Sequence, residues 1–181
     1  MPRIAWTQCS SFCEFSFNKQ VEKPRARGVS FFLARHEAMK AEAGTYVLVM
    51  KNTAVEELRI GSHGLLEIKP GFYLYVGSAF GPGGVAARVG RHCRDDKKLR
   101  WHIDYLRQAV TVEEAWYSHS TKRLEHDWAH ALSQLDGMET IPGFGSSDRP
   151  CPSHLFFNAS WPEPRLLAVT TGCGIEISSF R

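Results

Sequence analysis

Two tyrosines and two basic residues have the types and spacing of a phosphate-handling site. Tyr46 closes a Gly-Thr-Tyr tripeptide at the start of a stretch rich in β-forming residues, and Tyr75 opens a Tyr-Val-Gly tripeptide at the end of another. Arg88 and His92 follow on a segment with helical periodicity, where residues four apart share one face. Two phenols, a guanidinium and an imidazole could together bind and polarise a phosphate group.

The residues around these side chains predict the strands that must position them. Short runs of β-branched and aromatic residues, bounded by turn-forming residues, predict strands over residues 45–50, 58–60, 65–68 and 72–76. Because the connections between these strands are short, neighbouring strands are expected to pair antiparallel. Tyr73 and Tyr75 share one face of their strand, and the apolar residues that alternate with them share the other.

Apolar residues at helical or alternating spacing predict the other elements. Helices are expected over residues 30–43, around Val85 and Val89, and over residues 103–110 and 124–135. Further strands are expected near Trp116 and over residues 154–157 and 166–171. The chain is therefore expected to combine antiparallel strands with helices.

Length, composition and hydropathy limit the classes of protein that fit. A chain of 181 residues with 43% hydrophobic and 23% charged residues is expected to form one globular domain, or one domain with an extension. No run reaches the roughly 18 apolar residues that a membrane span needs, and residues 1–18 lack the apolar core of a signal peptide. We therefore expect a cytoplasmic protein without a membrane partner.

Positive charge is concentrated in two segments, although the formal net charge is only +3. One segment is residues 1–35, and the other is residues 88–100. The basic residues of the second segment are Arg88, Arg91, Arg94, Lys97, Lys98 and Arg100. A basic patch on an otherwise slightly acidic chain suggests a polyanionic partner, with nucleic acid first, while ordinary scatter of surface charge is the alternative.

The tyrosine tripeptides, their separation and the later arginine resemble the GIY-YIG nuclease family. Further motifs resemble the Uri-type branch of that family, and they occupy residues 75–79, 88–92, 97–106 and 143–148. The resemblance implies an α+β fold with a small central antiparallel sheet flanked by helices. We expect residues 44–160 to form this nuclease-like domain, with residues 1–43 and 161–181 as N- and C-terminal extensions.

The resemblance also implies divalent-metal-dependent hydrolysis of phosphodiester bonds with one metal-binding glutamate. Glu125, near the start of a predicted helix, occupies the matching position. Mg²⁺ or Mn²⁺ is the implied cofactor, and a single carboxylate suits Mg²⁺, which keeps several waters and takes other oxygens from a phosphate. The structural alternative is an acidic residue that only stabilises the helix N-terminus.

Catalytic roles follow from the resemblance together with side-chain chemistry. Tyr46 is expected to deprotonate or position the attacking water, Tyr75 to orient the water or the phosphate, and Arg88 to neutralise charge on the phosphoryl oxygens. A free tyrosine has a pKa near 10, so Tyr46 needs a nearby cation. His92 is the second candidate base because its reference pKa of about 6.5 suits neutral pH. Packing residues of a half-buried strand are the alternative for both tyrosines.

The basic segment is expected to contact the phosphate backbone of the substrate. Its contacting residues would be Arg91, Arg94, Lys97, Lys98 and Arg100. The nucleic acid is expected to be DNA rather than RNA. Trp101 is expected in the core, with stacking on an exposed base as the alternative.

Three other functions or sites stay open at this point. A nucleic-acid-binding module on the same fold would keep the basic segment but would not cleave. A thiol enzyme would use Cys151 and His154. A structural zinc site from His126, Cys151 and His154 is disfavoured because tetrahedral zinc takes four ligands.

Overall fold

The computed structural model describes residues 39–145 and 153–180. The predicted helix over residues 30–43 falls mostly outside these ranges, and its last residues, 39–43, are irregular. The loop residues 146–148 and Cys151 also lie outside them. The predicted N-terminal extension, residues 1–43, is therefore described only at its end.

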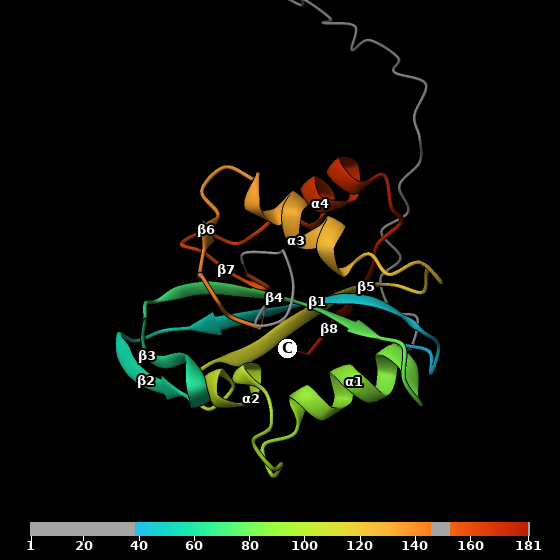
Figure 1. The fold of residues 1–181 in the computed structure, drawn as a ribbon. Helices are drawn as coiled ribbons and strands as arrows, with labels where there is room; N and C mark the ends of the chain where they lie inside the picture. The colour runs from blue at the N-terminus through green and yellow to red at the C-terminus, as the bar shows by residue number, and fades with distance from the viewer. Residues whose placement is uncertain (1–38, 146–152, 181) are drawn as a thin grey trace, which may run out of the picture. The chain divides into compact units, whose positions relative to one another are not determined.

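Six antiparallel strands form the central sheet, in the order β6-β7-β4-β1-β5-β8 (Figure 1). They are β1 (Gly44–Asn52), β4 (Gly71–Ala79), β5 (Thr111–Ser118), β6 (Glu139–Thr140), β7 (Leu155–Asn158) and β8 (Glu176–Ser179). The central strand β1 is buried at every position except Lys51. Its continuous apolar run is typical of a strand that is covered on both faces.

Two shorter strands lie outside this sheet. β2 (Glu56–Ile60) and β3 (Gly64–Ile68) pair with each other as an antiparallel two-stranded ribbon. A short 3-10 turn, η1 (Gly61–His63), connects them. The four strands predicted over the first half of the domain are confirmed, and each is one or more residues longer than its sequence pattern indicated.

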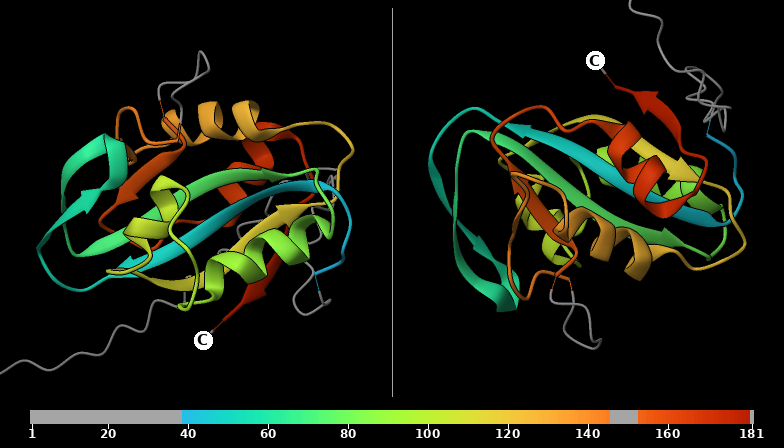
Figure 2. Two further views of the ribbon diagram at one scale, coloured as in Figure 1. Left: turned by 60° about the horizontal axis from the view of Figure 1, so that its bottom comes forward. Right: turned by 90° about the horizontal axis from the view of Figure 1, so that it is seen from above.

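Helices cover both faces of the sheet, which Figure 2 shows from two sides. On one face lie α1 (Gly84–Cys93) and α2 (His102–Leu106), and on the other lie α3 (Glu125–Ser133) and α4 (Pro164–Thr171). Each face has its own apolar core. Tyr46 and Tyr73 belong to the core beside α1 and α2, whereas Leu74 and Val76 belong to the core beside α3 and α4. The alternation predicted along residues 72–76 is therefore confirmed.

The start of α1 is held by the segment that precedes β1. The backbone N–H of Val85 donates to the carbonyl of Glu42 at 2.8 Å, and that of Ala86 donates to the carbonyl of Lys40 at 3.3 Å. Gly84 has a φ of +53°, and a Cβ there would overlap the carbonyl of Glu42. A glycine is therefore needed for the chain to enter α1 this close to residues 40–42.

The strand predicted over residues 166–171 is wrong, because these residues belong to helix α4. Pro164 stands in the first turn of the helix, where its fixed φ is favourable, and Gly172 ends the helix with a φ of +63°. The hydroxyls of Thr170 and Thr171 donate to the carbonyls four residues earlier. β-branched residues that suggest a strand are thus accommodated in a helix by packing and local hydrogen bonds.

Residues 161–181, set apart above as a C-terminal extension, contribute α4 and β8 to the sheet domain. β8 pairs with β5 from Glu114↔Ser179 to Tyr117↔Glu176. In the described ranges, no helix has the length and apolar character required to cross a membrane. The predicted fold class, an α+β domain with a small antiparallel sheet flanked by helices, is confirmed.

Candidate active site

The two tyrosine tripeptides lie side by side at one end of the central strand pair. Tyr46 of β1 is directly opposite Gly77 of β4. A Cβ on Gly77 would overlap the hydroxyl of Tyr46, and a Cβ on Gly44 would overlap the carbonyl of Ser118. Both glycines are therefore explained by close approach, and the phenol of Tyr46 lies across the backbone of the second tripeptide.

Tyr46 and His92 form a buried hydrogen-bonded pair between β1 and α1. The Tyr46 hydroxyl lies 2.9 Å from Nε2 of His92, and the two residues are 2% and 1% exposed. Burial raises the pKa of Tyr46 well above its usual value, and burial lowers the pKa of His92 to about 3. Both groups are therefore neutral at pH 7, and which of them donates the hydrogen bond depends on the tautomer of His92.

Tyr75 joins this pair from the neighbouring strand. Its ring lies edge-on to His92, with centroids 6.1 Å apart, and burial raises its pKa as well. The positive charge of Arg88 lowers the pKa of both tyrosines, and the negative charge of Glu125 raises both. The predicted residues Tyr46, Tyr75, Arg88, His92 and Glu125 therefore share one electrostatic environment, although they come from four separate elements.

Glu125 begins α3 beside the ends of β1 and β4. The hydroxyl of Thr45 accepts the backbone N–H of Leu124 at 3.2 Å, which anchors the start of the helix. The hydroxyl of Ser78 donates to Oε2 of Glu125 at 2.9 Å, and Nδ1 of His154 lies 3.3 Å from Oε1. Burial raises the pKa of Glu125, but these two hydrogen bonds, together with electrostatic interactions with His154 and His126, hold the pKa below its usual value.

An ionised Glu125 is a suitable ligand for a hard divalent cation. Its side chain is 21% exposed, so it is not sealed from solvent. Within residues 39–145 and 153–180, no group of three or more His, Cys, Asp or Glu residues could hold a metal ion. A single carboxylate fits Mg²⁺, which completes its shell with waters and substrate oxygens.

Ser78 and His154 were not assigned to this site from the sequence. Ser78 follows the second tripeptide directly, and His154 was considered only as a zinc ligand or a partner of Cys151. His126 lies close to His154, with ring centroids 5.7 Å apart. Cys151 is outside the described residues, so neither the disfavoured zinc set nor the alternative thiol pair is tested.

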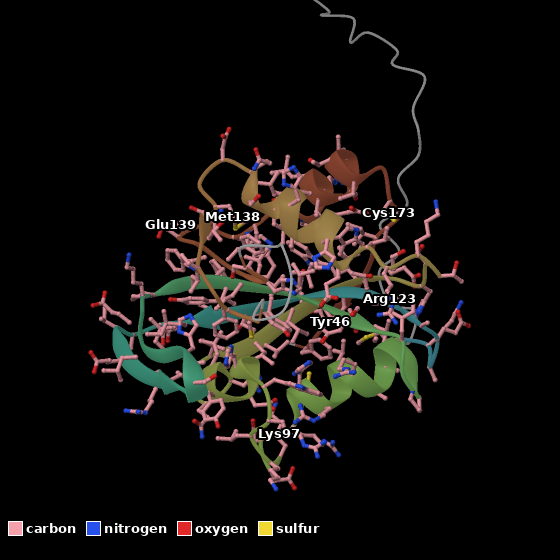
Figure 3. All side chains as sticks on the ribbon, viewed as in Figure 1. Tyr46, Lys97, Arg123, Met138, Glu139 and Cys173 are labelled. Carbon is pink, nitrogen blue, oxygen red and sulfur yellow. The ribbon has the colours of Figure 1, made fainter. Side chains whose placement is uncertain are left out.

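The basic segment divides into inward and outward side chains. Arg91 donates to both oxygens of Asp104 at 2.9 Å, and Nζ of Lys97 lies 3.5 Å from Asp104 with only 5% of its side chain exposed. Figure 3 shows Lys97 in the segment that connects α1 and α2. Arg94, Lys98 and Arg100, by contrast, are exposed. Arg91 and Lys97 therefore have internal partners, whereas the other three can reach a substrate.

A hollow next to α1 brings several guanidinium groups together. Arg88, Arg91, Arg94 and Arg100 line it with Trp101. Trp101 is 37% exposed rather than in the core, and the guanidinium carbons of Arg88 and Arg91 lie 4.6 and 4.0 Å from its ring centroid. These contacts are cation–π interactions, which hold both arginines beside the hollow.

A family model described as "Domain of unknown function DUF123" matches residues 45–172. The match begins at Thr45, directly after Gly44, and includes Tyr46, Tyr75, Arg88, His92 and Glu125. Neither a curated protein nor a solved structure matches the chain.

Proposed function

The chain belongs to the DUF123 family of domains of unknown function, and we propose that it is a divalent-metal-dependent endonuclease related to the Uri-type branch of the GIY-YIG nucleases. The observation that carries the proposal is the hydrogen-bonded Tyr46–His92 pair, in one electrostatic environment with Arg88 and an ionised Glu125. These groups are the base, the cation and the metal ligand that hydrolysis of a phosphodiester requires.

Tyr46 and His92 would act as a relay for one proton. As the oxygen of water attacks phosphorus, its proton passes to the Tyr46 oxygen, and the Tyr46 proton passes to Nε2 of His92. The bond from phosphorus to the leaving oxygen breaks, and that oxygen takes its proton from solvent. Arg88 compensates negative charge on the phosphoryl oxygens and favours the ionised form of Tyr46.

Glu125 would hold the divalent ion, with its carboxylate oriented by Ser78 and His154. A bound Mg²⁺ or Mn²⁺ would supply Lewis-acid polarisation of the phosphate. Tyr75, whose ring lies beside His92, would position the phosphate or the water. The arginine-lined hollow next to Arg88 would accept the phosphates that flank the cleaved bond.

The test is metal-dependent cleavage of a nucleic-acid panel. We expect nicking or cutting of DNA with Mg²⁺ or Mn²⁺, loss of activity with EDTA, and a loss of roughly 10²-fold or more in Glu125→Gln, because the metal loses its protein carboxylate. Asp127→Asn is the matched control, since Asp127 is also in the first turn of α3 but is exposed. Binding of nucleic acid without cleavage under any metal would favour the non-catalytic module instead.

A further inference from the structure

A buried carboxylate, Asp104, lies behind the Tyr46–His92 pair and was not among the predicted site residues. Its side chain is fully buried in α2. Both oxygens accept from Arg91 at 2.9 Å, and the backbone N–H groups of Arg100 and Trp101 donate to Oδ2 at 2.9 and 3.1 Å. Burial alone would raise the pKa of Asp104, but these hydrogen bonds hold it below its usual value. Asp104 is therefore an anion at neutral pH.

The other ring nitrogen of His92 faces this anion. Nδ1 of His92 lies 4.0 Å from Oδ1 of Asp104, and it is a buried atom with no hydrogen-bond partner in the described part of the chain. A neutral imidazole carries one N–H, so its proton is on either Nδ1 or Nε2. A proton on Nδ1 faces the carboxylate favourably, whereas a lone pair on Nδ1 would face it unfavourably.

We propose that Asp104 is a positioning residue that holds His92 in the Nδ1–H tautomer and so keeps Nε2 free to accept the proton of Tyr46. The tautomer is a property of the folded protein alone. Its catalytic consequence rests on the proposed nuclease function.

Asp104 differs in the sign of its charge from the basic side chains around His92. The groups that surround the imidazole are Tyr46 of β1, Tyr75 of β4, Arg88 and Arg91 of α1, Asp104 of α2, and Lys97 and Trp101 from the segment between the two helices. Arg88, Arg91 and Lys97 disfavour a protonated His92, and Asp104 opposes them. When His92 receives the proton of Tyr46, Asp104 is thus the anion that stabilises the resulting imidazolium.

The experiment is nitrogen-15 NMR of the protein labelled at histidine, because the two ring nitrogens report the tautomer directly. In the wild type at pH 7, we expect His92 to show a protonated Nδ1 and an unprotonated Nε2. In Asp104→Asn, we expect the Nε2–H tautomer to become populated, because the carboxylate charge is gone. Lys97→Met is the matched control: it removes another member of the same buried cluster but keeps Asp104, so the tautomer should not change.

Two results would overturn the proposal. One is an Nε2–H tautomer of His92 in the wild type, and the other is a folded Asp104→Asn protein whose tautomer is unchanged. If Asp104→Asn does not fold, the wild-type spectrum decides alone, with Nδ1–H in favour and Nε2–H against.

Cleavage kinetics give an independent measurement. Asp104→Asn should lower kcat by roughly 10- to 10²-fold with little change in KM, as is usual when a group supporting a reacting residue is removed. Asp95→Asn, the same substitution at an exposed carboxylate that pairs with Arg107, should leave kcat nearly unchanged. If the wild type does not cleave nucleic acid at all, the proposed function is wrong. The NMR experiment still tests, independently, whether Asp104 sets the tautomer of His92.

Discussion

Tyr46 is the single residue on which the proposed chemistry most depends, and burial works against its ionisation. Burial raises the pKa of its phenol, and the charge of Arg88 lowers it. In the proposed Nδ1–H tautomer of His92, the hydrogen bond to Tyr46 directs the phenolic proton toward Nε2. A tyrosine in this environment can serve as a base only when its proton moves to His92 as it accepts the proton of water.

Replacing Tyr46 with phenylalanine should therefore separate chemistry from packing. The ring stays in the core and only the hydroxyl is removed, so the free energy of unfolding should fall by about 1 kcal/mol. The cleavage rate should fall by roughly 10²- to 10⁴-fold, the usual effect of losing a general base. Urea unfolding and single-turnover cleavage measure the two effects.

Tyr73→Phe is the control for this variant. Tyr73 shares a strand face with Tyr75, but its hydroxyl accepts the backbone N–H of Lys69 at 2.7 Å and takes no part in the site. Tyr73→Phe should retain activity. Equal losses in the two variants would mean that the phenols serve packing, and a fully active Tyr46→Phe enzyme would move the role of base to His92.

His92 should make the free energy of unfolding depend on pH. Its pKa is about 3 in the folded protein and about 6.5 when unfolded, so between these values the unfolded state binds the extra proton. Stability should therefore fall as the pH decreases from 6.5 toward 3, by up to about 1.4 kcal/mol per pH unit from this group. Asp104, whose folded pKa is depressed, loses its contribution only below about 3.8.

Urea unfolding of the wild type and of His92→Gln at pH 7 and pH 5 tests this dependence. The wild type should lose more stability than the variant between these two pH values, because the variant has no imidazole at position 92 to protonate on unfolding. Parallel losses in the two proteins would show that His92 is not held neutral by burial.

At the scale of elements, the site depends on how closely β1, β4 and α1 approach one another. Tyr46 lies across Gly77 on the neighbouring strand, and α1 brings His92 against the phenol from the adjacent layer. α3 reaches the same end of the strands, where Ser78 of β4 bonds to Glu125. The glycine of the second tripeptide is what leaves room for this arrangement.

Gly77→Ala should therefore damage the site through sterics alone. The new methyl group would overlap the hydroxyl of Tyr46 and move it away from His92, so we expect cleavage to fall by at least roughly 10-fold, with some loss of stability. Gly90→Ala is the control, because a Cβ there has open space in an exposed helical position, and it should stabilise α1 by about 1 kcal/mol. Thermal unfolding measures the stability of both variants, and cleavage assays measure their activity. Normal cleavage by Gly77→Ala would contradict the close packing.

At the scale of the whole molecule, the sheet separates two apolar cores, and positive charge gathers beside one of them. The arginine-lined hollow lies next to α1, on the face that also carries His92. Of the four arginines that line it, Arg91 is paired with Asp104 and Arg88 has a role in the proposed chemistry. The other two, Arg94 and Arg100, are exposed. They should contribute affinity for phosphate without sequence preference.

Neutralising both residues should weaken nucleic-acid binding and its salt dependence. In Arg94→Gln/Arg100→Gln, we expect the slope of log affinity against log salt to become shallower by about 0.9 for each duplex phosphate that the protein no longer neutralises. Lys51→Gln/Arg165→Gln is the control of equal charge change at exposed positions outside the hollow. Fluorescence anisotropy across a salt series measures the slopes. Equal slopes in the two double variants would mean that only the overall charge matters.

Patterns that repeat over a few residues of the sequence were enough to predict several strands and helices of the domain. Period-two and period-four patterns identified β1, β4, α1 and α3, and the glycine–tyrosine tripeptides marked Tyr46 and Tyr75 as a pair. The spacing of Arg88 and His92 placed them on one helix face. The predictions of these strands and helices succeeded because strand and helix periodicity are local properties, carried by residues that are neighbours in the chain.

The partners of a side chain are known only from the folded protein, because the groups that stabilise a buried charge or a helix come together only when the chain folds. Residues 166–171 became α4 because the segment packs beside α3 and is bounded by Pro164 and Gly172. Arg91 and Lys97, which look like surface cations in the sequence, turn to the buried Asp104. Composition alone could not identify that carboxylate as buried, since burial of a charge depends on the donors that the fold places around it.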